Sequence, residues 1–336
     1  MSKPPLISII ITDFNAKRWL DKCISSIKTQ KFIDYEIVFV NDGSTDGSFE
    51  YVKKKFPDCI FVNNITNVGF ASANNAGATV ARGEFLFFLN ADTYLEIDTL
   101  QKLEQSLKKN PKIHYAQLDI RRYDKANMDG EACTFQIDRF GYPIWSGREE
   151  NPFYADAAAM IIKKDLFFKI GGFDERFYIY LEDLDLAWRA RLVGEEVYYL
   201  PKIYVYHFAG GTSVSTQIKE GTYATTIRRR YDAQKNNLRT LLKNLEPINL
   251  IWALPGSIAL ASGEGFLYLL RGNIWGFVAM HKAILWNIVS IHDTLKQRET
   301  VQDLRTVHDS VIYLHVDKRI SKIASFFTHG IPSMKT

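Results

Sequence analysis

The chain has 336 residues, of which 46% are hydrophobic and 24% are charged. This composition is typical of a globular protein and excludes a disordered or fibrous chain. The three cysteines, Cys23, Cys59 and Cys133, lie far apart without a Cys-x-x-Cys pair, so neither a disulfide framework nor a thiolate metal site is predicted. The opening MSKPPLISIII has one basic residue and too short an apolar run for a signal peptide, which predicts a cytoplasmic protein.

Charge is distributed unevenly along the chain. Residues 218–336 contain 16 Lys and Arg residues against 9 Asp and Glu residues, a net charge of +7, although the whole chain carries only +4. A basic C-terminal part favours an anionic partner, either a nucleic acid or a membrane surface. Because these basic residues stand beside an apolar, Trp-rich segment, the sequence favours a membrane and disfavours nucleic acid.

Strand-like and helical segments alternate over the first 120 residues. Strands are predicted at 6–12, 35–40, 59–63, 84–89 and 113–120, and helices at 16–30, 46–56, 71–81 and 97–110. Strands that alternate with helices of this length predict a parallel α/β sheet with right-handed crossovers. Residues 121–153 are polar and rich in turn formers, which predicts an inserted loop or hairpin, and one more helix is predicted at 182–193.

The pattern after residue 217 predicts helices only. The segment 249–291 is apolar and rich in Trp, but Pro255, Glu264, Arg271 and Lys282 interrupt it. No stretch is therefore expected to reach the length of a membrane span.

Two interpretations of these helices remain open. They pack as buried helices on the preceding domain or form oligomer contacts, or they lie in a membrane interface with Trp and basic residues at headgroup level. The second interpretation expects Trp252, Trp275 and Trp286 to be exposed. The basic charge of this part favours the membrane.

Polar side chains follow the first two predicted strands. Thr12, Asp13 and Asn15 end the first strand, and Asp42 follows the second within NDGSTDGS (41–48). A carboxylate at Asp42 can accept the imide N–H of a uracil or thymine ring. Its alternative role is in a helix N-cap, but neighbouring Ser, Thr and Asp residues already satisfy that need, which favours a function. Asp13 has no evident purpose, because a further negative charge near a diphosphate is unfavourable.

A third polar cluster precedes the helix predicted at 71–81. The segment NVGFASANNAG (67–77) places Asn67, Gly69 and Asn74 near the helix start, where backbone N–H groups and amides can approach a phosphate. It is not a Gly-x-Gly-x-x-Gly loop, so a dinucleotide site of the Rossmann type is disfavoured.

The apolar run 85–89 predicts a strand that is buried on both faces, and it ends at Asn90-Ala91-Asp92. One interpretation is a turn, since Asn and Asp commonly end strands. The other is an oxygen-ligand site for Mg²⁺ or Mn²⁺, because open parallel sheets bind ligands at the carboxyl ends of their strands. Asn90 and Asp92 point the same way if the strand geometry persists.

Three carboxylates crowd the start of the helix predicted at 182–193, after the aromatic run FYIY. One or two acidic residues complement the helix dipole, but three exceed that need and favour a sugar-handling site. The candidate residues on this helix are Glu182, Asp183, Asp185, Trp188 and Arg189. Another predicted strand ends in His207; a lone histidine is more often structural than a ligand, but its place at a strand end makes it a candidate.

Together these segments resemble family 2 glycosyltransferases of the GT-A fold, most closely the rhamnosyltransferase branch. The matching segments, in the family's order, are ISIIITDFN, VNDGSTDGS, NVGFASANNAG, GEFLFFLNAD, GGFDERFYIYLEDLDLAWR and YVYH, and the resemblance extends from residue 6 to about 215. It implies a Rossmann-like sheet flanked by helices in a GT-A domain at 1–216. The nucleotide-binding half is expected at about 1–120, the acceptor half at about 121–216 and an all-helical region at 217–336.

The resemblance also implies roles for single residues. LNAD stands where the family has its metal-binding Asp-x-Asp motif, so Asp92 is assigned to a divalent metal, Asp42 to the nucleobase, and Asp183 to general-base catalysis. His207 is assigned to the metal or the diphosphate. Asn90 replaces the first Asp of the motif, which implies weaker or indirect coordination by that position.

The implied reaction is inverting transfer of a sugar, with rhamnose as one candidate, from a UDP- or dTDP-linked donor. The expected acceptor is a hydroxyl of a glycan or lipid-linked saccharide in cell-surface polysaccharide or glycoconjugate assembly, at the cytoplasmic face of the membrane. Mg²⁺ or Mn²⁺ is the expected cofactor. Two alternatives are a sugar nucleotidyltransferase, whose typical Gly-rich N-terminal loop is absent from the sequence, and a catalytically inactive nucleotide-sugar-binding module.

Overall fold

The computed structural model describes residues 3–122, 134–146, 152–208, 217–219 and 222–335, so Cys133, Gly210 and Gly211 lie outside the described residues. The chain divides into two compact units. Unit 1 comprises residues 1–135, 145–178 and 195–213, and unit 2 comprises residues 136–144, 179–194 and 214–336. The helix that carries the three carboxylates, expected in the acceptor half of the first domain, therefore groups with the C-terminal helices.

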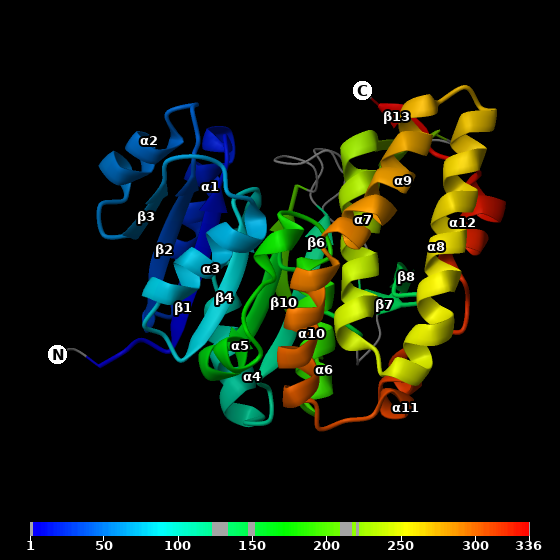
Figure 1. Cartoon of the computed structure of the whole chain (residues 1–336). Helices are drawn as coiled ribbons and strands as arrows, with labels where there is room; N and C mark the ends of the chain where they lie inside the picture. Colours follow the sequence, from blue (N-terminus) through cyan, green and yellow to red (C-terminus); the bar gives the residue numbers. More distant parts are fainter. Residues whose placement is uncertain (1–2, 123–133, 147–151, 209–216, 220–221, 336) are drawn as a thin grey trace. The chain divides into compact units, whose positions relative to one another are not determined.

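Unit 1 is built on an eight-stranded sheet (Figure 1) with the strand order β3-β2-β1-β4-β9-β6-β10-β5. The strands are β1 (Ile7–Asp13), β2 (Tyr35–Asp42), β3 (Ile60–Asn64), β4 (Phe85–Asn90), β5 (Thr93–Leu95), β6 (Tyr115–Arg122), β9 (Ala159–Lys163) and β10 (Tyr198–His207). The helices of this unit are α1 (Lys17–Lys28), α2 (Ser48–Lys55), α3 (Phe70–Val80), α4 (Thr99–Lys109), α5 (Lys164–Lys169) and the 3₁₀ turn η1 (Glu175–Phe177). The expected alternation of strands and helices up to residue 120 is confirmed.

The sheet is mixed: the expected parallel pairing is confirmed among the strands of the first 90 residues, and antiparallel strands that the sequence did not predict are added to it. Strands β3, β2, β1 and β4 are parallel, but β9 lies antiparallel between β4 and β6, and β5 is antiparallel to β10. The helical crossovers of the first 90 residues enforce parallel pairing. Strand β9 instead follows the inserted region and β5 follows a short turn, so neither is held to the parallel direction.

The core of unit 1 shows why β4 is so apolar. Phe85, Phe87 and Leu89 belong to the cluster that also buries the apolar stripe of α1. On the opposite face, the ring of Phe88 packs against Phe167 and Phe173, with centroids 5.2 and 5.1 Å apart. The prediction of a strand buried on both faces is confirmed.

Unit 2 is mainly helical. Its helices are α6 (Glu182–Leu192), α7 (Ile227–Asn244), α8 (Pro247–Leu270), α9 (Ile274–Val289), α10 (Ile291–Leu304), α11 (Asp309–Ile312), α12 (Ser321–His329) and the 3₁₀ turn η2 (Tyr313–His315). A small sheet of β11 (Gln217–Lys219), β12 (Thr222–Thr226) and β13 (Ser333–Lys335) corrects the expectation of helices only. Strands β7 (Thr134–Ile137) and β8 (Pro143–Ser146) pair in the inserted region, where a loop or hairpin was expected.

Helix α8 is longer than the sequence indicated. It continues without a break through Pro255 and Glu264, and within the described parts of the chain it is the single unbent helix whose length and composition would allow it to cross a membrane. The expectation that no stretch reaches this length is therefore wrong. Proline removes one helical hydrogen bond, and here the other residues of the helix maintain it.

Candidate active site

Asp42 ends strand β2 and organises the loop before α3. Its carboxylate accepts hydrogen bonds from the backbone N–H of Val68 (2.9 Å) and Gly69 (3.1 Å) and from Nδ2 of Asn64 (3.1 Å). A carboxylate offers about four acceptor positions, so these three donors leave capacity for one more. Asp42 is 4% exposed, and its position is fixed by the protein before any ligand binds.

Gly69 is required by close packing in this loop. Its φ is +95°, and a Cβ atom there would lie 2.5 Å from the ring of Tyr178. The hydroxyl of Tyr178 donates to Oδ1 of Asn67 (2.5 Å), and its carbonyl accepts from the N–H of Ala71 (3.3 Å). The structure thus brings Asn67, Gly69 and Asp42 together as predicted, with Tyr178 as an additional member that sequence reasoning noted only within an aromatic run.

The predicted residues at the end of β1 have mainly structural contacts. Asp13 is 1% exposed and accepts hydrogen bonds from Oγ of Ser48 (2.5 Å), Oγ of Ser44 (2.7 Å) and the N–H of Ala16 (3.0 Å). Burial raises the pKa of the Asp13 carboxyl, and these donors counteract it. Asp13 therefore ties the loop after β2 to the loop after β1, which explains a carboxylate that the sequence left unexplained.

Asn15 and Thr12 flank this connection. Oδ1 of Asn15 accepts from the N–H of Thr45 (2.7 Å), and the N–H of Asn15 donates to Oγ of Ser44 (3.0 Å). Thr12 is half-buried in β1 between Val40 and Asn90 of the neighbouring strands. Asn15 is exposed and remains accessible to a ligand, unlike Asp13.

Asn74 is buried and bonded within its own helix. It is 1% exposed, and its Nδ2 donates to the carbonyl of Phe70 one turn earlier in α3 (2.9 Å). Its neighbour Asn75 bonds both the N–H and the carbonyl of Phe173 (2.9 Å each). Both amides hold the helix in place, which argues against the predicted nucleotide contact of Asn74.

The ends of β4 and β10 form a polar group around one imidazole nitrogen. Nε2 of His207 lies 3.2 Å from Oδ1 of Asp92 and 3.5 Å from Nδ2 of Asn90. The backbone N–H of Phe208 donates to the carbonyl of Asp92 (3.0 Å), so the two segments are joined at this point. Asn90 and Asp92 reach the same atom, in agreement with the expectation that they point the same way.

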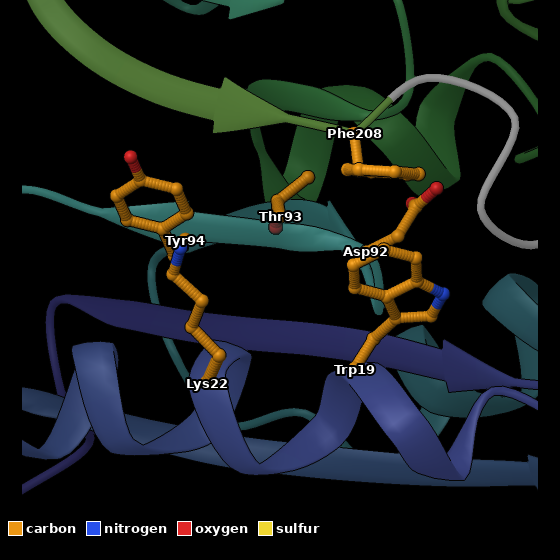
Figure 2. Close-up of a pocket in the computed structure, with 6 residues that line it drawn as sticks. All are labelled: Trp19, Lys22, Asp92, Thr93, Tyr94 and Phe208. Atoms are coloured by element: carbon orange, nitrogen blue, oxygen red, sulfur yellow. The ribbon is translucent and has the colours of Figure 1, made fainter. Parts of the chain in front are cut away.

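Trp19 and Phe208 lie beside Asp92, and Lys22 and Tyr94 line the same pocket next to each other (Figure 2). The rings of Trp19 and Phe208 pack together with centroids 4.2 Å apart, and Nζ of Lys22 lies 3.8 Å from the ring centre of Tyr94. The space between these side chains and Asp92 measures about 10 Å³, enough for about one water molecule. It can therefore hold a water molecule at Asp92 but not a sugar nucleotide. In the described parts of the chain, no three His, Cys, Asp or Glu side chains are grouped to hold a metal ion.

In unit 2, the three carboxylates at the start of α6 differ in exposure. Asp185 is fully buried and pairs with Nζ of Lys243 and Arg189, and Glu182 is 5% exposed. Asp183 is half-buried, and its Oδ1 accepts from the N–H of Leu184 (2.8 Å). Asp183 is therefore the most accessible of the three carboxylates.

Trp188 and Arg189 of the same helix support its packing. Trp188 is 1% exposed and Arg189 is 5% exposed, so neither offers a surface to a ligand. Asp185 and Arg189 form an ion pair across one helical turn at 2.8 Å. Trp188, Arg189 and Asp185 help to hold α6 in place, and their expected role as active-site support stays a prediction.

The backbone before α6 adopts an unfavourable conformation. Tyr178, Tyr180 and Leu181 all have positive φ values, which residues other than glycine rarely adopt. Nδ2 of Asn236 donates to the carbonyls of Ile179 (3.0 Å) and Tyr180 (2.6 Å). Strained backbone is concentrated at functional sites in proteins, and this strain directly precedes Asp183. Asn236 had no signal in the sequence, because it lies in α7, far along the chain.

The sheet and its flanking helices have the GT-A glycosyltransferase fold. Staphylococcus aureus TarS 1–349, solved in complex with UDP, has a TM-score of 0.53 at 16% identity, covering 89% of each chain. The mannosyltransferase PcManGT from Pyrobaculum calidifontis, solved with GDP-Man and Mn²⁺, has a TM-score of 0.51 at 16% identity, covering 90% of this chain and 86% of that one. The predicted fold class is confirmed.

Residues 8–170 match the family model described as glycosyl transferase family 2, and this segment is similar to that family. The poly-beta-1,6-N-acetyl-D-glucosamine synthase of Staphylococcus epidermidis is 28% identical over 204 residues, which cover 58% of this chain and 48% of that protein. The chain spans between 10% and 48% of the length of the curated relatives that it matches. The matched segment contains Asp42 and Asp92 but ends before Asp183 and His207.

Proposed function

We propose that this protein is an inverting glycosyltransferase that moves a sugar from a nucleoside diphosphate sugar to an acceptor hydroxyl. The observation that carries the proposal is the approach of Asn90 and Asp92 to Nε2 of His207 at the ends of β4 and β10. Open sheets of this kind bind ligands outside the carboxyl ends of their strands. The similarity of residues 8–170 to glycosyl transferase family 2 supports the same reaction class.

The donor set at this position fits a divalent cation. Asp92 supplies a carboxylate and His207 an imidazole nitrogen 3.2 Å away, both from strand ends that the sheet holds in place. Mg²⁺ and Mn²⁺ commonly use one or two protein ligands and take the others from substrate phosphates and water, so a large protein cluster is not needed. A bound cation would stabilise the charge on the departing nucleoside diphosphate.

Asp92 and His207 would hold the cation, and Asn90 would donate its amide to a bound water or phosphate oxygen. This division matches the chemistry of the three side chains, since an amide Nδ2 is a donor and cannot be a ligand. Asp42 would accept a hydrogen bond from the nucleobase with its remaining acceptor position. The backbone of residues 67–69, fixed by Asp42 and Tyr178, would line the nucleotide site together with Asn15.

Asp183 would act as the general base that removes the proton from the acceptor hydroxyl. Its support is its exposure, because Glu182 and Asp185 are buried while Asp183 is half-buried at the start of α6. The hydroxyl oxygen would then form its bond to the anomeric carbon as the bond to the diphosphate oxygen breaks. Attack from the face opposite the leaving group inverts the anomeric configuration.

The proposal includes a rhamnosyltransferase-like specificity, a UDP- or dTDP-linked donor, and an acceptor in cell-surface polysaccharide or glycoconjugate assembly. A lipid-linked saccharide at the cytoplasmic face of the membrane is the acceptor that agrees best with the apolar, basic C-terminal helices. The similarity to a poly-beta-1,6-N-acetyl-D-glucosamine synthase supports a glycan product. The solved structures with UDP and with GDP-Man and Mn²⁺ support a nucleotide-linked donor.

Release of nucleoside diphosphate tests the proposal. The purified chain is incubated with a panel of UDP-, dTDP- and GDP-linked sugars, with Mn²⁺ or with EDTA, and with lipid-linked and soluble saccharide acceptors. We expect turnover of one donor that needs the cation, mass-spectrometric evidence of the glycosylated acceptor, and loss of turnover in Asp92→Asn. The half-buried Asp98 in the N-cap of α4, which pairs with Lys102, provides the matched control Asp98→Asn, which should retain activity.

Two outcomes would overturn the proposal. Formation of pyrophosphate from a nucleoside triphosphate and a sugar 1-phosphate would identify a nucleotidyltransferase. Tight binding of a nucleotide sugar without turnover in the presence of any acceptor or cation would identify an inactive binding module. Full activity in EDTA would remove the metal from the mechanism while leaving glycosyl transfer in place.

A further inference from the structure

Helices α8 and α9 expose a continuous set of large apolar side chains. We call this set the apolar face: Ile248, Ile251, Trp252, Phe266, Leu269, Leu270, Ile274, Trp275, Val278, Leu285, Ile288 and Val289, each between 38% and 83% exposed. The set begins in the first turn of α8 and ends in the last turn of α9. Contiguous exposed apolar surface of this extent marks a protein or membrane contact in proteins.

The opposite sides of the two helices are buried, mostly through small and apolar residues, and a few polar side chains attach them to other parts of unit 2. Glu264 of α8 pairs with Nζ of Lys322 from α12 (2.5 Å) and with Arg230 from α7 (3.4 Å). Nδ2 of Asn287 of α9 donates to the carbonyl of Lys235 in α7 (3.0 Å). Each helix therefore has one face packed on the protein and one apolar face that is largely exposed, although Trp252 also packs beside Phe140 and Tyr313. This is the pattern of helices that lie in a membrane interface.

The turn between the two helices is rigid. Oδ1 of Asn273 caps α9 by accepting from the N–H of Gly276 (2.8 Å), and Gly272 adopts φ +75° at the end of α8. The buried ring of Tyr268 packs on Gly276, where a Cβ would lie 2.7 Å from the ring. Figure 1 shows this turn at one end of the helical bundle. The apolar face is thus a preformed surface and does not collapse onto the bundle.

Charge indicates which partner covers the apolar face. No Asp or Glu occurs in the sequence between Glu264 and Asp293, whereas Arg271 lies in the turn and Lys282 is exposed on α9. Basic residues beside exposed Trp and Leu side chains favour an anionic bilayer, to which each contributes attraction at the headgroups. A second copy of the chain would present the same two positive charges and repel them.

We infer that the apolar face lies flat in the interface of an anionic membrane, with α8 and α9 parallel to the bilayer surface. Apolar residues at both ends of α8 enter the interface together only in this orientation. If α8 spanned the membrane, Glu264 would enter the hydrocarbon, either separated from Arg230 and Lys322 or together with both. Either arrangement places charged side chains in the hydrocarbon at a high cost. The inference rests on the proposed function, because membrane contact would give the enzyme access to a lipid-linked acceptor.

The structure corrects one expectation about this surface. Trp286 was expected at headgroup level, but it is half-buried, and Nζ of Lys235 lies 5.0 Å from its ring centre with the Arg239 guanidinium at 5.9 Å. Trp252 and Trp275 are exposed as expected, at 38% and 65%. Trp286 faces α7, so it does not contribute to the membrane contact.

Flotation with liposomes tests the inference on the full chain. Vesicles of phosphatidylcholine with and without phosphatidylglycerol are compared for the wild type, for Ile251→Glu/Trp275→Glu, and for a control pair. The control Ile33→Glu/Leu314→Glu replaces side chains that are 86% and 80% exposed outside the apolar face. We expect binding that needs phosphatidylglycerol and weakens with salt, a loss of at least tenfold in the first pair, and wild-type binding in the control.

Three results would overturn the inference. The wild type does not float with anionic vesicles at low salt, the first pair floats as well as the wild type, or the bound chain resists extraction at alkaline pH as a spanning protein does. Light scattering that shows a wild-type dimer abolished by the first pair would assign the face to a second copy. Donor turnover with a soluble acceptor is measured on the same variants, so a failure of glycosyl transfer is separated from a failure of membrane docking.

Discussion

The two units place polar and apolar side chains in opposite ways. In unit 1, the interior is apolar, as in the run Phe85–Leu89, and the functional candidates lie at strand ends. In unit 2, α7 buries a long series of polar and charged side chains, whereas α8 and α9 expose large apolar ones. Burial of apolar surface from water stabilises both units, but in the second it is combined with many buried polar contacts.

This difference indicates that specific polar contacts stabilise unit 2 and that its exposed apolar surface is available to a partner. Asp185 accepts from Lys243 and Asn244 at 2.9 and 3.0 Å in a fully buried position. Buried charges of this kind are costly unless every partner is present. Substitutions at strand ends in unit 1 should therefore affect activity, whereas substitutions of buried polar residues in unit 2 should affect stability.

The largest expected effect is an exception to this division, because it is an effect on activity at a position in unit 2. Asp183→Asn should lower the rate of transfer by about 10² to 10⁴, because the amide cannot accept the acceptor proton. Its free energy of unfolding and its donor affinity should stay near those of the wild type, since Asp183 is half-buried and Asp185 carries the ion pairs. Steady-state turnover and nucleotide binding are measured side by side.

The matched control is Asp165→Asn, which changes an exposed acid in the first turn of α5. Near-normal turnover of Asp183→Asn would refute the assignment of the base.

A second prediction concerns the buried ion pair in unit 2. Lys243→Met should lower the free energy of unfolding by about 3 kcal/mol or more, because Asp185 loses a buried cationic partner. Urea denaturation followed by circular dichroism measures the change. The comparison variant Lys28→Met removes an exposed ion pair with Asp58 and should cost at most about 1 kcal/mol. Equal losses in both variants would contradict the contrast between the units.

A third prediction uses the pH dependence of α8. Burial raises the pKa of Glu264, but Arg230 and Lys322 outweigh it and hold the pKa at about 2. Because this value lies below the ordinary pKa, Glu264 stabilises the protein above about pH 4.5 and loses that contribution as the pH falls towards 2. The lowered pKa corresponds to roughly 3 kcal/mol at neutral pH.

Glu264→Gln should therefore be less stable than the wild type at pH 7, and the difference should shrink between pH 4.5 and pH 2. Thermal unfolding across this range measures it. A difference that stays constant with pH would show that the carboxylate charge is not what holds α8.

The smallest expected effect returns to unit 1. Gly69→Ala should weaken nucleotide binding and lower stability by about 1–3 kcal/mol, because φ of +95° and the ring of Tyr178 both oppose a Cβ. Adding Tyr178→Ala removes the steric clash and leaves the backbone strain, so the double variant should recover part of the loss. A Gly69→Ala protein that binds nucleotide as well as the wild type would contradict the proposed role of this loop.

The sequence predicted the local features of unit 1 well because they depend on neighbouring residues. Helical spacing in α1 and the apolar run of β4 each follow from a short stretch of chain. The antiparallel entry of β9 depends on long-range pairing and was not predictable in this way. The role of Asp13 was equally hidden, since its partners Ser44 and Ser48 lie more than 30 residues away.

Unit 2 was harder to predict because its polar interior removes the usual periodic signal. Asn236 and Lys243 occur in a helix whose polar sequence is typical of a solvent-exposed helix, yet both side chains are buried. The site residues at strand ends were identified through their position after apolar runs and through the family resemblance. Which of the three acids in α6 is accessible could be decided only from the fold, because sequence spacing places Glu182, Asp183 and Asp185 in a single turn.

Cation binding at Asp92 tests the central claim most directly. Electron paramagnetic resonance of free Mn²⁺ is titrated with the protein, with and without UDP, dTDP or GDP, for the wild type, Asp92→Asn and Asp98→Asn. We expect one nucleoside diphosphate to tighten Mn²⁺ binding at least tenfold in the wild type and in Asp98→Asn, and we expect this coupling to be absent in a folded Asp92→Asn. Coupling that is equally strong in Asp92→Asn, or that is absent for every nucleotide in the wild type, would contradict this claim.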